Sequence, residues 1–357
     1  MKKPTWKTIS IILLPIQIVF FLFIENNENW IENYYSRGFF KSISLGLRWF
    51  TGFFNFSIGL VLVYFLSVWL IVYLAKALYL IVKKKLKFRT FIYNSVAILS
   101  PIYFFYMLTW GLAYHKKPLE KLLNLDSKNI QDSEIIELSK VLVDSANSTR
   151  TRISQTQIDK LSFQEIFEKA PVGYQNLKEK YSFLKYEKPS IKKAFGSNLL
   201  SYMSTSGIYM FPTGEANVNT NNVFYDAPYV TTHEMAHQLG FASEEEASYL
   251  AFLACKNNPD PVFQYSAYYG TVFRALNKVW EIDSTQSKSL FEKLSPTVKA
   301  DLEKEKAIWK KFRNPIQKYI VSPFYDLFLK SNGQEQGSRS YDLVVELMVA
   351  ERRKAMK

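Results

Sequence analysis

Long apolar runs are confined to the first third of the chain, where they cover about residues 9–24, 56–82 and 91–114. The last two runs are long enough for the roughly 20 residues that a membrane-spanning helix needs, and the first is at the short end of that range. Buried helices of a soluble protein are the alternative, but such helices rarely stay apolar over this length. We therefore predict three transmembrane helices and a membrane domain over residues 1–114.

The first apolar run also has features of a secretory signal peptide, because Lys2, Lys3 and Lys7 precede or open it. A signal peptide would end in small residues at its cleavage site. The sequence that follows here is ENNENW, which is a poor cleavage site. We expect the run to remain as an uncleaved anchor.

The distribution of basic residues predicts the orientation of the spans. The chain carries a formal net charge of +13. Its densest basic run lies between the second and third spans and consists of Lys83, Lys84, Lys85, Lys87 and Arg89. The loop at 25–55 has mixed charges instead. Positive loops stay in the cytoplasm and contact anionic headgroups, so we expect everything after about His115 on the outer side of the cytoplasmic membrane, in the periplasm or cell exterior. The basic balance thus favours a lipid bilayer as partner, and no motif for nucleic acid accompanies it.

The remainder of the chain has the pattern of a soluble domain over residues 115–357. Apolar residues recur at helical spacing between 116 and 188, and again after Pro228. Between them, residues 190–226 contain Gly, Ser and Asn with short apolar–polar alternations, which predicts two or three strands. The expected fold class is a mainly helical α+β domain with a small β-sheet.

The segment with candidate chemistry is 230–239, VTTHEMAHQL. On a helix, His233 and His237 face the same side, so that one zinc ion can bind both. Glu234 stands beside the first histidine and can act as general base on a water activated by the metal. The alternative is an ordinary helix with a histidine pair. The chain has only 3 histidines, and two of them at this spacing favour the metal site.

A catalytic zinc site needs a third protein ligand and an open position. His115 ends the third span and is expected at the membrane interface, and the single cysteine, Cys255, excludes a thiolate cluster and an intramolecular disulfide. An acidic ligand therefore fits best. Gly240 is expected to end the motif helix in a left-handed conformation.

Three glutamates open the next predicted helix, at Glu244, Glu245 and Glu246. Glu246 has an ordinary explanation, since Ser243 and Glu246 form a capping-box pattern. Glu244 heads a helix face of small side chains that can approach another helix closely, namely Ala247, Ser248, Ala251 and Ala254. We predict Glu244 as the third ligand, with Glu245 and Glu246 as the alternatives.

HEMAH followed by SEEEASYLAFLAC resembles the gluzincin arrangement of zinc metallopeptidases. There, a glutamate after the two histidines has a small residue three positions on and often an aspartate four on. Ala247 and Ser248 stand at those positions here, and the step from His237 to Glu244 is shorter than in thermolysin-like enzymes. The stretches HEMAHQLGFASEEEASYLAFLAC, FQYSAYY and YDLFLKSNGQEQGSRSYDLVVELM are similar to an uncharacterised family of bacterial membrane proteins, which implies three N-terminal spans and no particular substrate.

The zincin resemblance implies further parts of a site. A strand before the motif helix would pair with an extended peptide, and Ile208–Asn219 is the candidate. A tyrosine, histidine or arginine would stabilise the developing oxyanion. Arg339 and Tyr341, in GSRSYD, are the candidates, although the chain has 23 tyrosines and most are ordinary packed residues.

We expect a membrane-anchored zinc-dependent metallopeptidase that acts on extended peptide or protein substrates. The alternatives are a catalytically inactive zinc-binding membrane scaffold or binding module, and a zinc amidohydrolase acting on envelope substrates. Glu234 argues against the scaffold, because a structural zinc site needs no base. An intramembrane protease is disfavoured, since the motif lies more than a hundred residues beyond the last span.

Overall fold

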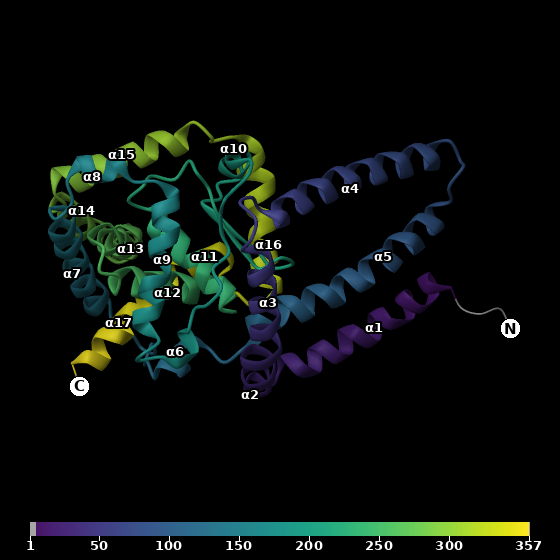
Figure 1. Cartoon of the computed structure of the whole chain (residues 1–357), viewed down its shortest axis with the longest axis horizontal. Coiled ribbons are helices and arrows are strands. Elements are labelled where there is room, and N and C mark those ends of the chain that lie inside the picture. Colours follow the sequence, from purple (N-terminus) through teal and green to yellow (C-terminus); the bar gives the residue numbers. More distant parts are fainter. Residues whose placement is uncertain (1–4, 357) are drawn as a thin grey trace.

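The computed structural model describes residues 5–356 and is mostly helical. Three of its helices are long and apolar enough to cross a membrane: α1 (Trp6–Glu25), α4 (Ile58–Val82) and α5 (Phe88–Thr109). They extend from one side of a compact helical body (Figure 1). The three predicted apolar helices are thus present. The third is shorter than expected, because the backbone breaks from helical geometry at Trp110 and continues as a short turn, η2 (Gly111–His115).

The segment 25–55, which was expected to be a loop between two spans, is mostly helical. It forms α2 (Glu28–Trp30), a π-helix η1 (Ile31–Phe40) and α3 (Lys41–Thr51). Apolar side chains such as Ile31 and Tyr35 recur at helical spacing and are buried. Ser44 of α3 donates a hydrogen bond to the carbonyl of Gln238 over 2.8 Å, so this segment lies directly against the helical body of the molecule.

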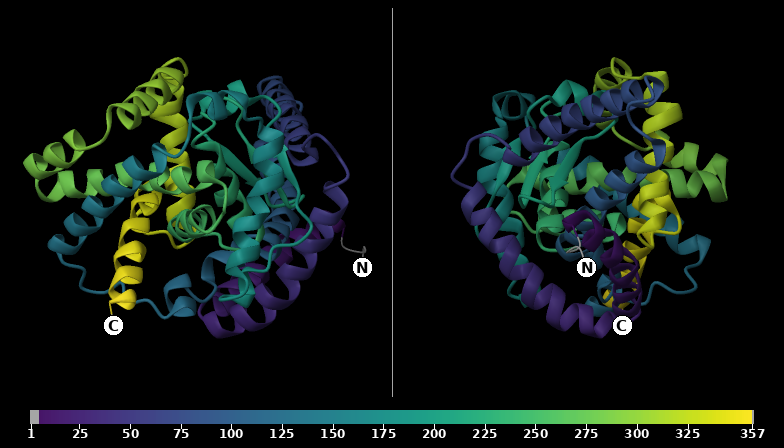
Figure 2. Two further views of the ribbon diagram at one scale, coloured as in Figure 1. Left: turned by 60° about the vertical axis from the view of Figure 1, so that its left-hand side comes forward. Right: turned by 90° about the vertical axis from the view of Figure 1, so that its right-hand side faces the viewer.

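The body of the molecule is a helical core. Its helices are α6 (Leu119–Leu123), α7 (Asp132–Arg150), α8 (Gln155–Lys160), α9 (Phe163–Leu177), α10 (Ser197–Tyr202), α11 (Ala227–Gln238), α12 (Glu244–Lys256), α13 (Pro261–Ile282), α14 (Ser284–Glu292), α15 (Pro296–Lys310), α16 (Ser322–Ser331) and α17 (Val344–Ala355), with short turns η3 (Ser182–Leu184), η4 (Gln317–Val321) and η5 (Gly337–Leu343). Helix α12 packs against α9, α11 and α13, and α13 runs along α7 (Figure 2). Large side chains such as Tyr174, Tyr249 and Tyr265 are fully buried between these helices.

A three-stranded sheet covers α11. Its order is β1 (Ile191–Lys193), β3 (Glu215–Val218), β2 (Gly207–Met210), with β1 parallel and β2 antiparallel to β3. The expected strand at Ile208–Asn219 is therefore two strands of a hairpin. The chain turns between them because Pro212 suits a turn and Gly214 has a φ of +71°, a conformation that glycine adopts readily. Strand β2 is an edge strand.

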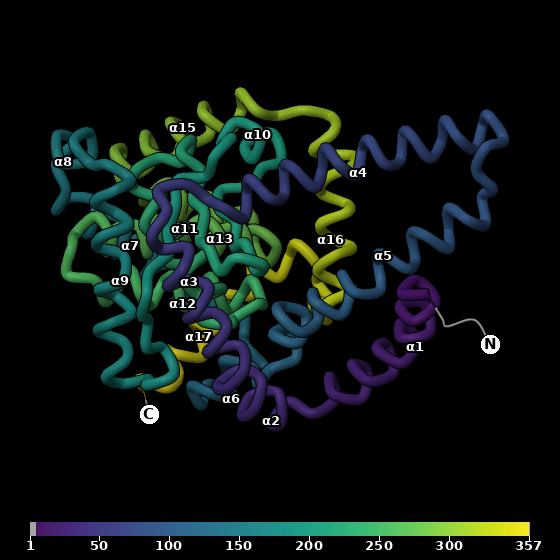
Figure 3. Tube along the Cα trace, turned by 45° about the vertical axis from the view of Figure 1, so that its right-hand side comes forward, coloured from purple at the N-terminus to yellow at the C-terminus, as the bar shows by residue number. Residues whose placement is uncertain are grey.

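The sheet is also attached to the apolar helices. The buried carboxylate of Glu215, in β3, accepts hydrogen bonds from the backbone N–H groups of Ile58 (3.0 Å) and Gly59 (2.6 Å) in the first turn of α4. At the end of α5, the ring of Trp110 lies 4.8 Å from that of Tyr209 in β2. Helices α1 and α5 run side by side, whereas α4 diverges from them toward the body (Figures 1 and 3). The helical body thus rests directly on the ends of two apolar helices.

Candidate metal centre

Helix α11 carries the HExxH motif through the centre of the molecule. Every one of its residues is buried. Thr231 and Thr232 donate their hydroxyl groups to carbonyls one turn back, so their polar atoms are satisfied without water. The helix ends where expected, at Gly240, whose φ is +85°. His233 and His237 project from one side of this helix.

Helix α12 brings Glu244 to that side. Its small residues allow close approach: the hydroxyl of Thr232 lies 3.5 Å from the carbonyl of Ala251 and 3.2 Å from Cys255 Sγ. The Glu244 carboxylate, at the first residue of α12, then lies 3.1 Å from His233 Nε2 and 3.6 Å from His237 Nε2. The ligand atoms of these three buried residues all lie within 4.8 Å of one another and could hold a metal ion.

The neighbouring glutamates point elsewhere. Glu245 lies 3.2 Å from the side-chain amide of Gln334. Glu246 accepts a hydrogen bond of 2.5 Å from the backbone N–H of Leu119. The expected capping box at Ser243 does not form, because Ser243 makes no side-chain cap and Gln334 accepts from the Glu244 N–H instead. Of the three candidates, only Glu244 meets the histidines.

Hydrogen bonds to the two imidazoles favour metal binding through Nε2. His237 Nδ1 donates to the carbonyl of Phe241 over 2.7 Å, which leaves Nε2 as the lone-pair atom. His233 Nδ1 lies 3.4 Å from the hydroxyl of Ser248. Ser248 thus stands near the ligand histidine where the resembled enzymes often have an aspartate. Such partners fix the tautomer and the ring orientation of a metal-ligating histidine.

The charge distribution also suits a cation. Burial lowers the pKa of His233 to about 4 and keeps this imidazole neutral. Burial alone would lower the pKa of His237 as well, but the carboxylate of Glu244 outweighs it and raises that pKa to about 9. Despite its burial, Glu244 has a pKa well below its usual range because both imidazoles lie against it. This carboxylate therefore attracts positive charge to the point between the two rings.

Glu234 lies beside the cluster but is not one of its three ligands. Its Oε2 atom is buried and has no hydrogen-bond partner among residues 5–356. Its Oε1 atom faces Gly207 in β2 so closely that a Cβ atom at position 207 would lie 2.5 Å from it. A buried carboxyl group with an unpaired oxygen is costly, and in native proteins it is explained by a bound water, an ion or ligand, local strain, or a catalytic role.

Of the two candidate oxyanion residues, the structure brings only Tyr341 to the centre. Its ring stacks on that of His233, with the ring centroids 6.0 Å apart. Its hydroxyl lies 3.0 Å from that of Tyr325, which in turn donates to Glu244 Oε1 over 2.7 Å. The side chain of Arg339 is exposed and makes no hydrogen bond or ion pair with residues 5–356.

Sequence reasoning missed three residues of the centre. Tyr325 contacts Glu244 across 81 positions of the chain. Arg274 donates to the carbonyl of Tyr341 over 3.0 Å, and its guanidinium lies 5.4 Å from the centre of the Tyr341 ring. Trp110 packs its ring edgewise on that of His237 at 5.6 Å. No local spacing signals such contacts, because each joins distant parts of the sequence.

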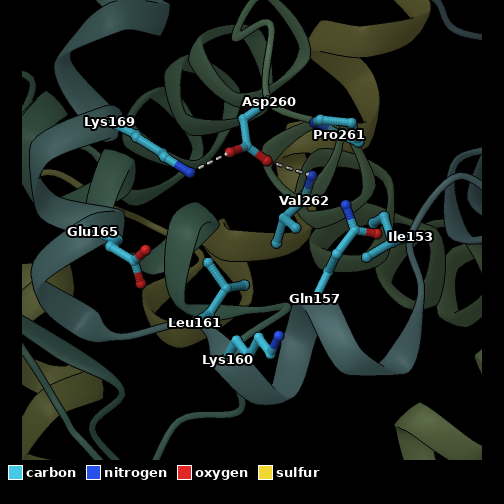
Figure 4. A pocket seen from close by; sticks show the side chains of 9 residues that line it. All are labelled: Ile153, Gln157, Lys160, Leu161, Glu165, Lys169, Asp260, Pro261 and Val262. Atoms are coloured by element: carbon cyan, nitrogen blue, oxygen red, sulfur yellow. Dashed lines mark hydrogen bonds and ion pairs between the residues drawn. The ribbon is translucent and has the colours of Figure 1, made fainter.

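Two other features lie outside the centre. His115 is 3.8 Å from Glu25 and, in the part of the chain that the structure describes, makes no hydrogen bond or ion pair with the motif helix. The hollow drawn in Figure 4 shares no residue with the metal-ligand cluster. In this hollow, the carboxylate of Asp260 already accepts hydrogen bonds from Lys169 Nζ (2.8 Å) and from the N–H of Val262 (2.9 Å). The negative charge of Asp260 is therefore neutralised by groups of the chain itself.

Comparison with known proteins assigns a family but no activity. No curated protein and no solved structure matches the chain. A family model with the description "Protein of unknown function (DUF3810)" matches residues 35–349, which include the second part of η1, the second and third apolar helices, and the whole metal centre. Since this match covers most of the sequence, the chain belongs to the DUF3810 family of proteins of unknown function.

Proposed function

We propose that this protein is a membrane-anchored, zinc-dependent metallohydrolase of gluzincin type that cleaves peptide bonds on the outer side of the cytoplasmic membrane. The observation that carries the proposal is the unpaired carboxylate oxygen of Glu234 beside the cluster of His233, His237 and Glu244. A purely structural metal site would have no use for this costly buried group.

The donor set suits zinc. Two imidazole Nε2 atoms and one carboxylate are the ligands of many catalytic zinc sites, which keep a further position open. When bound, zinc supplies Lewis-acid polarisation of the scissile carbonyl and makes water more acidic. His233, His237 and Glu244 would hold it, with Ser248 and Phe241 orienting the two rings.

The chain's own residues supply the proton transfers and the positioning. Glu234 Oε2 is free to accept a proton from the attacking water and to pass it to the leaving amine. The hydroxyl of Tyr341, beside the His233 ring, is our candidate to donate a hydrogen bond to the developing oxyanion. Strand β2 would present its outer edge to an extended peptide, because its inner edge is paired with β3.

The basic loop between α4 and α5 supports the proposed location of the metal centre on the outer side of the membrane. The basic loop Lys83–Arg89 joins α4 to α5 at the end that lies farthest from the body of the molecule (Figure 1). Basic loops remain in the cytoplasm. The metal centre would then work on the opposite side, outside the bilayer.

Metal content tests the site first. Full-length protein is purified in detergent and analysed for bound metals by mass spectrometry. Wild-type protein is expected to hold about one zinc per chain, and His233→Ala and His237→Ala are expected to lose it. His115→Ala is the matched control, since it removes the third histidine without touching the cluster. Wild-type protein without stoichiometric metal would contradict the proposal.

Activity is the second test. Wild-type protein and Glu234→Gln are assayed on casein and on a mixed peptide library. We expect hydrolysis to fall by about 10²–10⁴-fold in Glu234→Gln while zinc is retained, because only the proton acceptor is lost. Glu245→Gln is the matched control and should remain active, since Glu245 points to Gln334. Bound zinc without any Glu234-dependent hydrolysis would refute the peptidase and favour the scaffold.

A further inference from the structure

The segment formed by η4 and α16 turns an apolar face outward. The side chains of Ile316, Tyr319, Ile320, Phe324 and Leu327 are between 52% and 70% exposed. They recur every three or four residues and therefore lie on one side of the helical segment. On the other side, Leu329 is fully buried and Tyr325 reaches the metal ligand Glu244. The body of the molecule therefore covers only one side of this helical segment, and the apolar side chains on its other side remain exposed.

This segment lies at the domain-side ends of the apolar helices. Figures 1 and 3 both show α16 between the ends of α4 and α5. The side chain of Asn332, just after α16, accepts a hydrogen bond of 2.6 Å from the hydroxyl of Tyr106. The ring of Phe328 lies 6.3 Å from the Tyr106 ring. Tyr106 belongs to the last turn of α5, so the end of α16 is fixed at the level where this helix would leave the bilayer.

A second apolar surface continues the first. Helix α10 and its flanking residues expose Phe195, Leu199, Tyr202 and Met203. The carbonyl of Phe195 accepts a hydrogen bond of 2.8 Å from the hydroxyl of Tyr64 in α4. Tyr64 is six residues, or about 9 Å, along α4 from its first residue. The contact with α10 therefore lies within the candidate span and not beyond its end.

The two surfaces are joined at their edges. The side-chain amide of Asn314 donates to the carbonyl of Tyr202 over 2.8 Å, and the ring of Phe312 lies 5.2 Å from the Tyr202 ring. We call the exposed apolar residues of both surfaces the apolar collar. Its members are Phe195, Leu199, Tyr202, Met203, Ile316, Tyr319, Ile320, Phe324 and Leu327. The collar adjoins α4 directly, since the ring of Phe195 lies 6.1 Å from that of Tyr64.

Basic side chains border the collar. Lys310, Lys311, Arg313 and Lys318 are exposed and immediately precede or interrupt the apolar positions of η4. An apolar face flanked by lysine and arginine is the pattern of a helix that lies in the surface of a membrane with anionic headgroups. A symmetric contact with a second copy of the chain would instead bring these like charges together.

We propose that η4 and α16 form an interfacial helix, and that the bilayer crossed by α1, α4 and α5 covers the apolar collar. The outer face of the segment lies in the membrane surface while its inner face carries Tyr325 to Glu244. The metal centre is thus separated from lipid by the thickness of one helix, about 10 Å. This proposal depends on the three spans and not on the catalytic function proposed above.

The test measures contact with lipid at single positions. Phe324→Cys and Leu327→Cys are made in the native background, whose only cysteine, Cys255, is fully buried. Trp280→Cys is the matched control, because Trp280 is also an exposed aromatic residue (51%) and lies near the end of α13, shortly before α14. Figure 1 shows α14 on the side of the body that faces away from the spans. Each full-length variant is labelled with bimane and placed in nanodiscs of phosphatidylcholine and phosphatidylglycerol at 3:1. Unchanged thermal unfolding and the absence of labelling in wild-type protein confirm that each variant is folded and singly labelled.

Quenching by lipid with a nitroxide near the headgroup should be at least about threefold stronger at positions 324 and 327 than at 280, because only the first two lie in the acyl chains. Iodide in the water should show the reverse order. Equal access of iodide to all three labels would overturn the proposal. Protection from both quenchers, together with cross-links between two copies, would also overturn it and assign the collar to self-association. Neither result would affect the metal content or the hydrolysis that test the proposed function.

Discussion

Replacing Gly207 by alanine tests whether β2 holds Glu234 in place. The backbone of Gly207 does not have a positive φ, so alanine can adopt the same conformation. Any effect of Gly207→Ala must therefore come from the contacts of the added methyl group. It would lie 2.5 Å from Glu234 Oε1 and 2.8 Å from Val230 Cγ1.

The size of the effect follows from these distances. Ordinary contacts of a Cβ atom begin at 3.4 Å, so the strand and the carboxylate must separate by close to 1 Å. Forcing a methyl group into a packed interior costs about 1–3 kcal/mol of stability. Displacing a catalytic group by ~1 Å costs on the order of 10²-fold in rate. The three atoms nearest to the new methyl group belong to Glu234 and Val230 and not to His233, His237 or Glu244, so zinc content should be unchanged.

The assay compares kcat, zinc content and Tm of Gly207→Ala with those of wild-type protein. We expect kcat to fall by about 10²-fold and Tm to fall by about 2–4 °C for each kcal/mol lost. Gly46→Ala is the control, because a Cβ atom at position 46 meets nothing within 4 Å. Wild-type kcat and Tm in Gly207→Ala would show that β2 does not press on Glu234 and would refute the reasoning.

Two other predictions concern the metal and the pH dependence of stability. Tyr325→Phe removes a hydrogen bond to the Glu244 carboxylate and should weaken zinc binding by about 10–100-fold in competition with a chelator, whereas Tyr319→Phe, on the outer face, should leave it unchanged. The hydrogen bond from Arg353 lowers the pKa of Glu134 from 4.5 to about 2, so this pair stabilises the fold above pH 4.5 and loses its effect as the pH falls toward 2. The difference in Tm between wild-type protein and Glu134→Gln should therefore be present at pH 7 and narrow at pH 3, and a constant difference would contradict this role.

The parts of the fold that sequence could predict are those with local signals. The apolar runs predicted three helices, and the four-residue step from His233 to His237 placed both rings on one side of α11. The small face of α12 favoured Glu244, because close approach of two helices depends on side-chain size, which is readable from sequence. The helices at 25–55 were missed because this segment was treated only as the connection between two spans, although buried residues such as Ile31 recur at helical spacing.

Other parts depend on distant contacts and gave no local signal. Tyr325 meets Glu244 only after the chain has folded through α13 and α15. The role of Gly207 is equally hidden, since a glycine before a strand looks like an ordinary turn residue until α11 is packed beneath it. The hairpin turn at Gly214 did have a signal in its Pro-Thr-Gly sequence, and the expected single strand overlooked it.

The hydrogen bonds between the carboxylate of Glu215 and the first turn of α4 make this apolar helix part of the folding unit. Two backbone N–H groups of that helix, with the hydroxyls of Ser57 and Thr213, satisfy a carboxylate that has no exposed surface. A truncated protein that begins after the third apolar helix would leave Glu215 with only the hydroxyl of Thr213 among these donors, and it would expose Leu200 and Met210, which pack on Leu60 of α4. The segment with the three apolar helices is thus part of the folded unit, and production of the residues after α5 as a free fragment should require a substitution at Glu215 as well as a new cover for β2 and β3.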